Sequence, residues 1–149
     1  MSGGGTTAQE LEALMRREKG FLGCWPSDKL PKFRTVCSLI INTDPSDRPG
    51  EHWIGLVMNN RNCFYFDPLG APILSLTVLK KLAARFKTAT FCNKQIQHLA
   101  SDSCGLFVAA FIQRVKTRED YVNFVKLFSL TNLRANDQIC KALISAGAV

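Results

Sequence analysis

The sequence predicts an α+β fold, in which a small mixed β-sheet packs against a central helix. Three observations predict this fold: an amphipathic helix pattern opens the chain, short β-branched segments follow it, and apolar helical patterns occupy the second half. The chain has 149 residues, 46% of them hydrophobic, which is enough to bury a core in one domain. We therefore expect a single domain over residues 1–149, with residues 1–6 disordered.

A short amphipathic helix is expected near the start of the chain. Thr7 and Glu10 form a capping-box pattern, and apolar residues then recur at helical spacing, which predicts a helix over 7–18. Gly20 is expected to end this helix. Residues 21–26, which contain a glycine and a proline, predict an apolar loop.

Strands are expected in the middle of the chain and helices toward its end. The β-branched, apolar run at 35–41 predicts a strand buried on both faces, and the segment 44–50, rich in Pro and Asp, predicts a loop. Thr131 is expected to cap the last helix. Further strands are expected at 52–58, 63–66 and 88–92, and further helices at 75–87, 104–115, 119–128 and 131–146.

A tight hairpin is expected to follow the strand that begins at His52. Asparagine tolerates a positive φ, so Asn59 and Asn60 are expected to be the two central residues of the turn. Counting outward from that turn places His52 directly across from Asp67 on one face of the sheet. A one-residue change of the turn would instead make Leu69 the partner. The sequence thus predicts a carboxylate beside an imidazole.

A cysteine and a histidine form the candidate catalytic pair. Cys104 opens the predicted central helix, where backbone N–H groups and the helix dipole stabilise a thiolate. His52 is the preferred base for this thiol, and His98, the other of the two histidines, is the alternative. Asp67 is expected to orient the ring of His52. Taken singly, a buried cysteine is more often inert packing and an Asp-Pro pair a plain turn, but their coincidence favours a cysteine hydrolase.

Negative charge that develops on a substrate carbonyl oxygen needs hydrogen-bond donors already in place. The backbone N–H of Cys104 is one candidate donor. The side-chain amide of Gln97 is the other, because a neutral amide does not quench a thiolate. Gln95 competes with Gln97 for this role.

The cysteines are expected to be reduced thiols. The six cysteines are scattered along the chain, and no Cys-x-x-Cys or His-x-x-x-His spacing is present. We therefore expect neither a disulfide framework nor a metal site, and no cofactor that the chemistry itself requires.

A formal net charge of +7 predicts attraction to polyanions, with nucleic acid as the first candidate. The cluster Lys80, Lys81, Arg85 and Lys87 supplies candidate DNA contacts, although solvated helix faces explain any single basic cluster as well. No apolar run approaches the roughly 20 residues of a membrane span, and no export signal is visible. We expect a soluble protein without a membrane partner. A basic nucleic-acid-binding protein without catalysis is the alternative from another class.

Three motifs in the chain occur in a characteristic combination. They are Gly50-Glu51-His52-Trp53, Tyr65-Phe66-Asp67-Pro68-Leu69-Gly70 and Cys104-Gly105-Leu106-Phe107. Gln97 lies between the second and the third, so that the functional groups occur in the order His, acid, Gln, Cys. This combination resembles the adenovirus-type cysteine endopeptidases, the adenain family, within the wider clan of ubiquitin-like-specific proteases, over roughly residues 8–115.

The resemblance implies a papain-like site geometry with His52 as base and Asp67 as the orienting acid. It also implies Cys104 as nucleophile and Gln97 as an oxyanion donor, since Gln97 stands seven residues before the cysteine, as in the family. It further implies cleavage of viral precursor proteins at Gly-containing sites during virion maturation, in the host nucleus or the virion, with DNA as an activator. An isopeptidase that removes ubiquitin-like modifiers is the runner-up within the same chemistry.

The chain also departs from the family. It is shorter than typical relatives between Asp67 and Gln97 and after Val115. In the family, a cysteine upstream of the glutamine bonds an activating peptide. Cys92 is the nearest counterpart here, but its spacing from Gln97 does not fit, so activation by a peptide is not expected.

Overall fold

The computed structural model describes residues 6–43, 52–71, 76–86 and 89–147. The expected disordered start lies outside the described residues except for Thr6, whose carbonyl oxygen accepts a hydrogen bond of 3.1 Å from the indole N–H of Trp53. The loop expected at 44–50 also lies outside them. The elements follow in the order α1 (Ala8–Met15), β1 (Phe21–Pro26), β2 (Val36–Asn42), β3 (Trp53–Asn59), β4 (Asn62–Phe66), α2 (Leu76–Ala83), β5 (Thr90–Phe91), α3 (Cys104–Arg114), α4 (Arg118–Lys126) and α5 (Leu133–Gly147).

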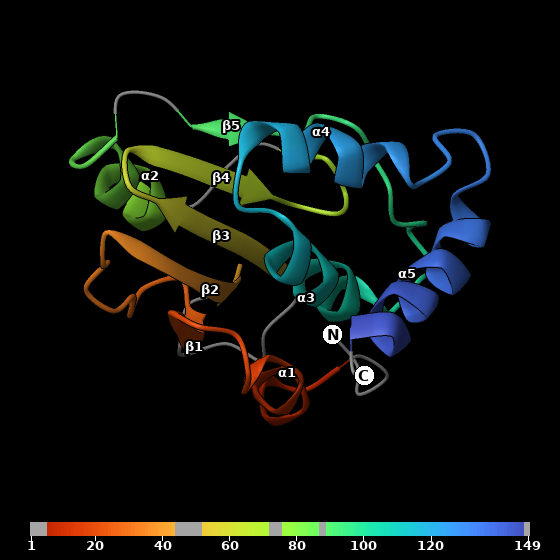
Figure 1. Ribbon diagram of the computed structural model, residues 1–149, viewed down its shortest axis with the longest axis horizontal. Helices are drawn as coiled ribbons and strands as arrows, with labels where there is room; N and C mark the ends of the chain where they lie inside the picture. The colour runs from red at the N-terminus through yellow and green to blue at the C-terminus, as the bar shows by residue number, and fades with distance from the viewer. Residues whose placement is uncertain (1–5, 44–51, 72–75, 87–88, 148–149) are drawn as a thin grey trace.

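The strands of the described chain form one mixed sheet in the order β1-β2-β3-β4-β5. The inner pairs β2-β3 and β3-β4 are antiparallel, whereas both edge strands, β1 and β5, are parallel to their neighbours. A parallel neighbour requires a crossover connection, and α2 provides it between β4 and β5 (Figure 1). The predicted α+β fold with a small mixed sheet is confirmed.

Helices cover both faces of the sheet, because the central strands carry apolar side chains on both sides. Ile40 and Val57 belong to the core cluster that contains α3, whereas Leu39 and Leu56 belong to the cluster that contains side chains of α2. Figure 1 shows α3 against one face of the sheet, with α1, α4 and α5 arranged around it. The predicted burial of the second strand on both faces is confirmed.

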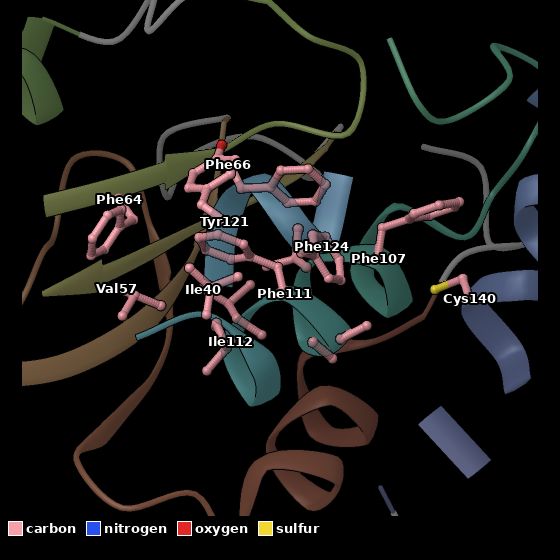
Figure 2. Packing of buried hydrophobic residues seen from close by; sticks show 14 of the residues in the cluster. Ile40, Val57, Phe64, Phe66, Phe107, Phe111, Ile112, Tyr121, Phe124 and Cys140 are labelled. Carbon is pink, nitrogen blue, oxygen red and sulfur yellow. The ribbon is translucent and has the colours of Figure 1, made fainter. Parts of the chain in front are cut away.

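The helix α3 is the centre of the larger cluster. Most of its residues are buried, and Phe66 of β4 stacks on its Phe111 with ring centroids 4.9 Å apart. Tyr121 and Phe124 of α4 approach these two rings edge-on (Figure 2). Such aromatic pairs each contribute roughly 0.5–1.5 kcal/mol beyond area burial. The aromatic cluster therefore ties α3 and α4 to β4.

A glycine in β3 allows α3 to approach the sheet closely. A Cβ atom at Gly55 would lie 2.8 Å from Cγ1 of Val108 and 3.1 Å from Cδ2 of Phe111. Real Cβ atoms essentially never show the first distance, and the second is tighter than most Cβ contacts. The position of α3 relative to β3 thus depends on the absence of a side chain at Gly55.

The strand β1 corrects the expectation of a loop over 21–26. Its residues pair in parallel with β2, and the register is irregular between Phe21 and Cys24. Gly23, inside this irregularity, has a φ of +104°. Gly23 therefore introduces a bulge into the edge strand β1 and does not prevent the strand from forming. The strand was not predicted because its pairing with β2 cannot be inferred from the local sequence pattern.

The predicted N-cap of the first helix is confirmed, but the helix is shorter than expected. The side chain of Thr7 accepts the backbone N–H of Glu10 at 3.2 Å. The helix ends at Met15 rather than at residue 18. Gly20, with a φ of +78°, follows in the turn that leads into β1.

Two caps in the C-terminal half differ from expectation. Thr117 and Asp120 form a complete capping box, so α4 begins at Arg118, slightly earlier than predicted. Thr131 does not cap α5, which begins at Leu133. The backbone N–H of Thr131 instead donates to the hydroxyl of Ser129. Ser129 therefore organises the turn before α5.

Replacing Gly55 by alanine is expected to lower the free energy of unfolding by about 1–3 kcal/mol, because the new methyl group must displace α3 or strain its side chains. Urea unfolding followed by circular dichroism measures this loss. In a Val108→Ala background the same replacement is expected to cost less, because the methyl group it meets first is gone. An equal loss of stability in both backgrounds would show that the contact with Val108 does not limit how closely α3 approaches β3.

Candidate active site

His52 and Asp67 lie beside each other at the open end of the β3-β4 hairpin. Nε2 of the His52 ring is 2.6 Å from Oδ1 of Asp67. The two side chains are 15% and 5% exposed, so little water competes with this hydrogen bond. The backbone carbonyl of His52 accepts the N–H of Thr43 at 2.8 Å, which ties the residue to the neighbouring strand.

The predicted turn of this hairpin is wrong by one residue. Asn59 pairs with Asn62, so the two central residues are Asn60 and Arg61. Among the described residues other than glycine, Asn60 is the one with a positive φ, at 59°. Asparagine does adopt the positive φ of this turn, as the sequence predicted. Because two asparagines are adjacent, the sequence alone did not determine where the two-residue turn begins.

The contact between His52 and Asp67 survives this change of register. Extending the observed pairing would set Leu69 across from His52, which is the alternative that the sequence allowed. Asp67 then lies two residues away on the same face, as a diagonal neighbour, and its carboxylate still reaches the ring. A shift by two positions leaves every side chain on its original face of the sheet.

The turn after β4 holds the carboxylate in place. Oδ1 of Asp67 also accepts the backbone N–H of Leu69 at 2.8 Å, and the carbonyl of Asp67 accepts the N–H of Gly70 at 2.8 Å. The oxygen that faces His52 is therefore fixed by its own turn as well as by the ring.

This turn is joined to the segment that carries Gln97. The carbonyl oxygen of Pro68 accepts the backbone N–H groups of Ile96 and Gln97 at 2.8 and 2.9 Å. Gly70, with a φ of +72°, lies so close to this segment that a Cβ atom would be 2.7 Å from the carbonyl carbon of Lys94. The turn after Asp67 and the segment of Gln97 are thus joined by backbone hydrogen bonds, which no sequence motif predicted.

Gln97, and not Gln95, has its side chain buried in the site region. Gln97 is 3% exposed, and its Nε2 donates to the carbonyl oxygen of Ser101 at 3.0 Å. Its Oε1 is buried without a hydrogen-bond partner among the described residues. The amide of Gln95 donates to the backbone carbonyl of Gln97 at 3.0 Å and so supports the same segment.

Cys104 is the first residue of α3 and is 2% exposed. The first backbone N–H groups of a helix have no partner within the helix. Ser103, at the N-cap position, makes no side-chain cap hydrogen bond, so its hydroxyl does not occupy these groups. The helix start therefore offers unpaired N–H groups and a partial positive charge beside the sulfur.

A second glycine brings the two parts of the site together. A Cβ atom at Gly105 would lie 3.0 Å from both methyl carbons of Leu11 and 3.2 Å from Cδ1 of Trp53. Trp53 follows His52 in the chain, and Gly105 follows Cys104. The close contact of these two neighbours therefore sets the start of β3 against the start of α3.

The pKa of His52 is raised from its ordinary value of 6.5 to about 9. Burial is the largest single influence and lowers the pKa, but side-chain hydrogen bonds to Asp67 and Cys104, and the electrostatic attraction of both, raise it by more. The ring thus bonds the acid and lies near enough to the thiol for both to raise its pKa. It carries a positive charge at neutral pH.

The other candidates named from the sequence lie in different surroundings. Nδ1 of His98 accepts the backbone N–H of Ala100 at 3.0 Å. The sulfur of Cys92 accepts the N–H of Lys94 at 3.3 Å. All six cysteines are free thiols. Within the part of the chain that the structure describes, no group of three or more His, Cys, Asp or Glu side chains is placed to hold a metal ion.

The basic cluster proposed for DNA is partly engaged within the fold. Nζ of Lys81 donates to two backbone carbonyls between β1 and β2 and lies 4.9 Å from the ring centre of Phe33. Lys80 and Arg85 are exposed, and Lys87 lies outside the described residues. No described helix is long and apolar enough to cross a bilayer.

A thiol at a helix start beside a hydrogen-bonded His–Asp pair is the arrangement of sites in which cysteine acts as a nucleophile. The chain is 30% identical over 136 residues to the protease of human adenovirus B serotype 3, and 31% identical over 132 residues to the protease of snake adenovirus serotype 1. These alignments include 74% and 72% of the chain. The predicted resemblance to the adenovirus protease family is confirmed.

The chain spans 63% and 64% of the length of these two relatives. No protein-family model matches it. Among solved structures, the ASFV protease has a TM-score of 0.42 at 18% identity, covering 76% of this chain and 44% of that one. AvrA with IP6 and CoA has a TM-score of 0.46 at 17% identity, covering 88% and 52%. Both scores are below 0.5, so neither structure defines the activity of this chain.

The imidazole of His52 is expected to titrate near pH 9 in an NMR pH series. In Asp67→Asn the titration is expected at lower pH, because the hydrogen-bonded carboxylate is lost while burial remains. The exposed Asp102→Asn is the matched control and should leave the titration unchanged. An unchanged midpoint in Asp67→Asn would show that the carboxylate does not hold the ring.

The same titration predicts how stability depends on pH. The pKa of His52 in the folded chain lies above 6.5, so its interactions stabilise the fold fully below about pH 6.5 and this stabilisation is lost as the pH rises through about 9. Denaturant midpoints measured across this range should fall more in the wild-type chain than in Asp67→Asn.

Proposed function

We propose that this chain is a cysteine endopeptidase of viral origin that cleaves peptide bonds through an acyl-enzyme at Cys104. The observation that carries the proposal is the placement of one ring: His52 bonds Asp67 at 2.6 Å, and both Asp67 and Cys104 lie close enough to raise the pKa of the ring. Similarity to two adenovirus proteases supports it. A basic binding protein would have no need for a buried imidazolium between an acid and a thiol.

The ring nitrogens have separate tasks in this mechanism. Nε2 of His52 is bonded to Asp67, which leaves Nδ1 for Cys104. An imidazolium beside a thiol favours the thiolate. The thiolate attacks the substrate carbonyl carbon, and His52 then gives its proton to the departing amine nitrogen as the C–N bond breaks. Water then loses a proton to His52 and attacks the resulting thioester, the C–S bond breaks, and the carboxyl product leaves while the thiolate beside a protonated His52 is regenerated.

The oxygen of the attacked carbonyl becomes negative and needs donors that are already oriented. The backbone N–H of Cys104 is one donor in our proposal. The second is the side-chain amide of Gln97, of which one N–H is occupied by the carbonyl of Ser101 and the other remains.

We infer that substrates present glycine next to the scissile bond. Cys104 is 2% exposed, so a substrate backbone must approach closely to reach the sulfur. Glycine has no Cβ atom and permits such an approach. We further propose that the substrates are precursor proteins of a virus, cleaved in the infected cell nucleus or the virion. The two relatives, both adenovirus proteases, support a protein substrate.

Cys104→Ala is expected to abolish cleavage of peptides with internal Gly-Gly sites, whereas Cys92→Ala should retain it.

Iodoacetamide is expected to label Cys104 first, because burial raises the pKa of Cys24, Cys63 and Cys140 to about 12 and keeps them unreactive. Mass spectrometry of digested protein reads the order of labelling. Cleavage by Cys104→Ala, or equal labelling of all six thiols, would overturn the proposal. Strict dependence on a folded ubiquitin-like modifier would favour the isopeptidase.

We also propose DNA as an activator, held through Lys80 and Arg85 by phosphate contacts. The net charge of +7 and the exposure of both side chains support this. Lys81 is a weaker candidate, because its ammonium group already bonds two carbonyls.

Removing both Lys80 and Arg85 by alanine substitution is expected to reduce the salt slope of duplex DNA binding by about 1.8, since each phosphate contact contributes about 0.9. Fluorescence anisotropy of labelled DNA at several salt concentrations measures the slope. Lys126→Ala on α4 is the control for loss of charge. An equal decrease of the slope in Lys126→Ala would show that DNA binding is not centred on Lys80 and Arg85.

A further inference from the structure

The C-terminal helix α5 contacts the segment 96–103, which leads to Cys104, at two points. Two consecutive residues of the helix, Asn136 and Asp137, make these contacts. They lie 40 and 36 positions along the chain from their partners. No motif in the C-terminal part of the chain pointed to a role in the site.

Asn136 holds the upstream end of the segment. It is fully buried, and its Nδ2 donates to the carbonyl oxygens of Ile96 and Ser129, both at 2.8 Å. Its Oδ1 accepts the backbone N–H of Ser129 at 2.8 Å. A buried amide with this many partners fixes the backbone directly before Gln97.

Asp137 holds the downstream end through Ser101. The hydroxyl of Ser101 lies 3.0 and 2.9 Å from the two carboxylate oxygens of Asp137 and donates to them. The same hydroxyl oxygen accepts the backbone N–H of Ser103, the N-cap of α3, at 3.1 Å. The carbonyl of Ser101 receives the side-chain amide of Gln97 at 3.0 Å.

Ser101 therefore connects three features. Through its carbonyl it orients the amide of Gln97, through its hydroxyl oxygen it holds the start of the helix that carries Cys104, and through its hydroxyl proton it is anchored to α5. Loss of the hydrogen bonds to Asp137 frees the Ser101 hydroxyl to rotate away from the backbone N–H of Ser103. Both candidate oxyanion donors then lose a fixed position.

We propose that Asn136 and Asp137 are positioning residues that hold the oxyanion donors of the site from the C-terminal helix. This inference rests on the proposed cysteine endopeptidase function. Neither residue touches the substrate or the thiol in this scheme. They act on the rate of the chemical step through Ile96 and Ser101, so kcat is the constant they control.

Asp137→Ala tests the inference, because Asp137 is only partly buried and its loss leaves no deeply buried group unpaired. We expect kcat for peptide cleavage to fall about 10-fold to 100-fold, with KM within about a factor of two. Asp137→Asn keeps an oxygen that accepts the Ser101 hydroxyl and should restore most of the rate. Gln138→Ala, the next residue on α5 and exposed, is the matched control and should leave kcat unchanged.

Two thiol reagents separate positioning from general damage. A peptide aldehyde forms a tetrahedral adduct whose oxygen needs the oxyanion donors, whereas iodoacetamide alkylates sulfur without forming one. Asp137→Ala is expected to bind the aldehyde more weakly by the factor lost in kcat and to react with iodoacetamide at the wild-type rate. An equal loss with both reagents, or equal rates for Asp137→Ala and Asp137→Asn, would overturn the inference.

Hydrogen exchange at the backbone amide of Ser103 provides a readout that does not depend on turnover. Its protection is expected to fall in Asp137→Ala and not in Gln138→Ala. If the wild-type chain cleaves peptides and Asp137→Ala matches it in kcat and in Ser103 protection, the positioning role falls and the proposed function stands. If the wild-type chain cleaves nothing while Asp137→Ala loses Ser103 protection, the proposed function falls and the coupling of α5 to this segment stands.

Discussion

The close packing of α3 on β3 is the constraint on which the site depends. Two glycines permit it: Gly55 admits Val108 and Phe111 of the helix, and Gly105 admits Trp53 of the strand. Because the first residue of α3 is Cys104 and the residue before β3 is His52, the same packing that buries the core brings thiol and imidazole together. A helix that lay one methyl group farther from the sheet would separate them.

Hydrogen bonds between loops complete what the packing begins. The carbonyl of Pro68 holds the segment of Gln97 against the turn of Asp67, and Ser101 links that segment to the start of α3. The one described amide oxygen of this region without a partner belongs to Gln97, the residue proposed as oxyanion donor. An unpaired buried acceptor costs about 1–3 kcal/mol, and such groups are tolerated mainly where a site requires a particular orientation.

Local chemistry in the sequence predicted much of the fold and the contact between His52 and Asp67. Thr7 caps its helix as expected, the apolar run of β2 is buried on both faces, and the hairpin forms at the asparagines. The turn is displaced by one residue, yet His52 and Asp67 still meet, because the alternation of side chains along a strand preserves their face. The strand β1 was missed, because a parallel edge strand depends on a neighbour rather than on its own periodicity.

The sequence by itself determined which groups are available for chemistry: two histidines, a thiol at the start of an apolar helix, and an acid after a strand. These follow from residue type and short-range spacing, which a linear pattern contains. Only the tertiary structure decided that the ring of His52 bonds Asp67 and lies near Cys104, and that Asn136 and Asp137 hold the segment before the cysteine. Such contacts join residues far apart in the chain, and their geometry is set by how helices and sheet pack, which no local pattern records.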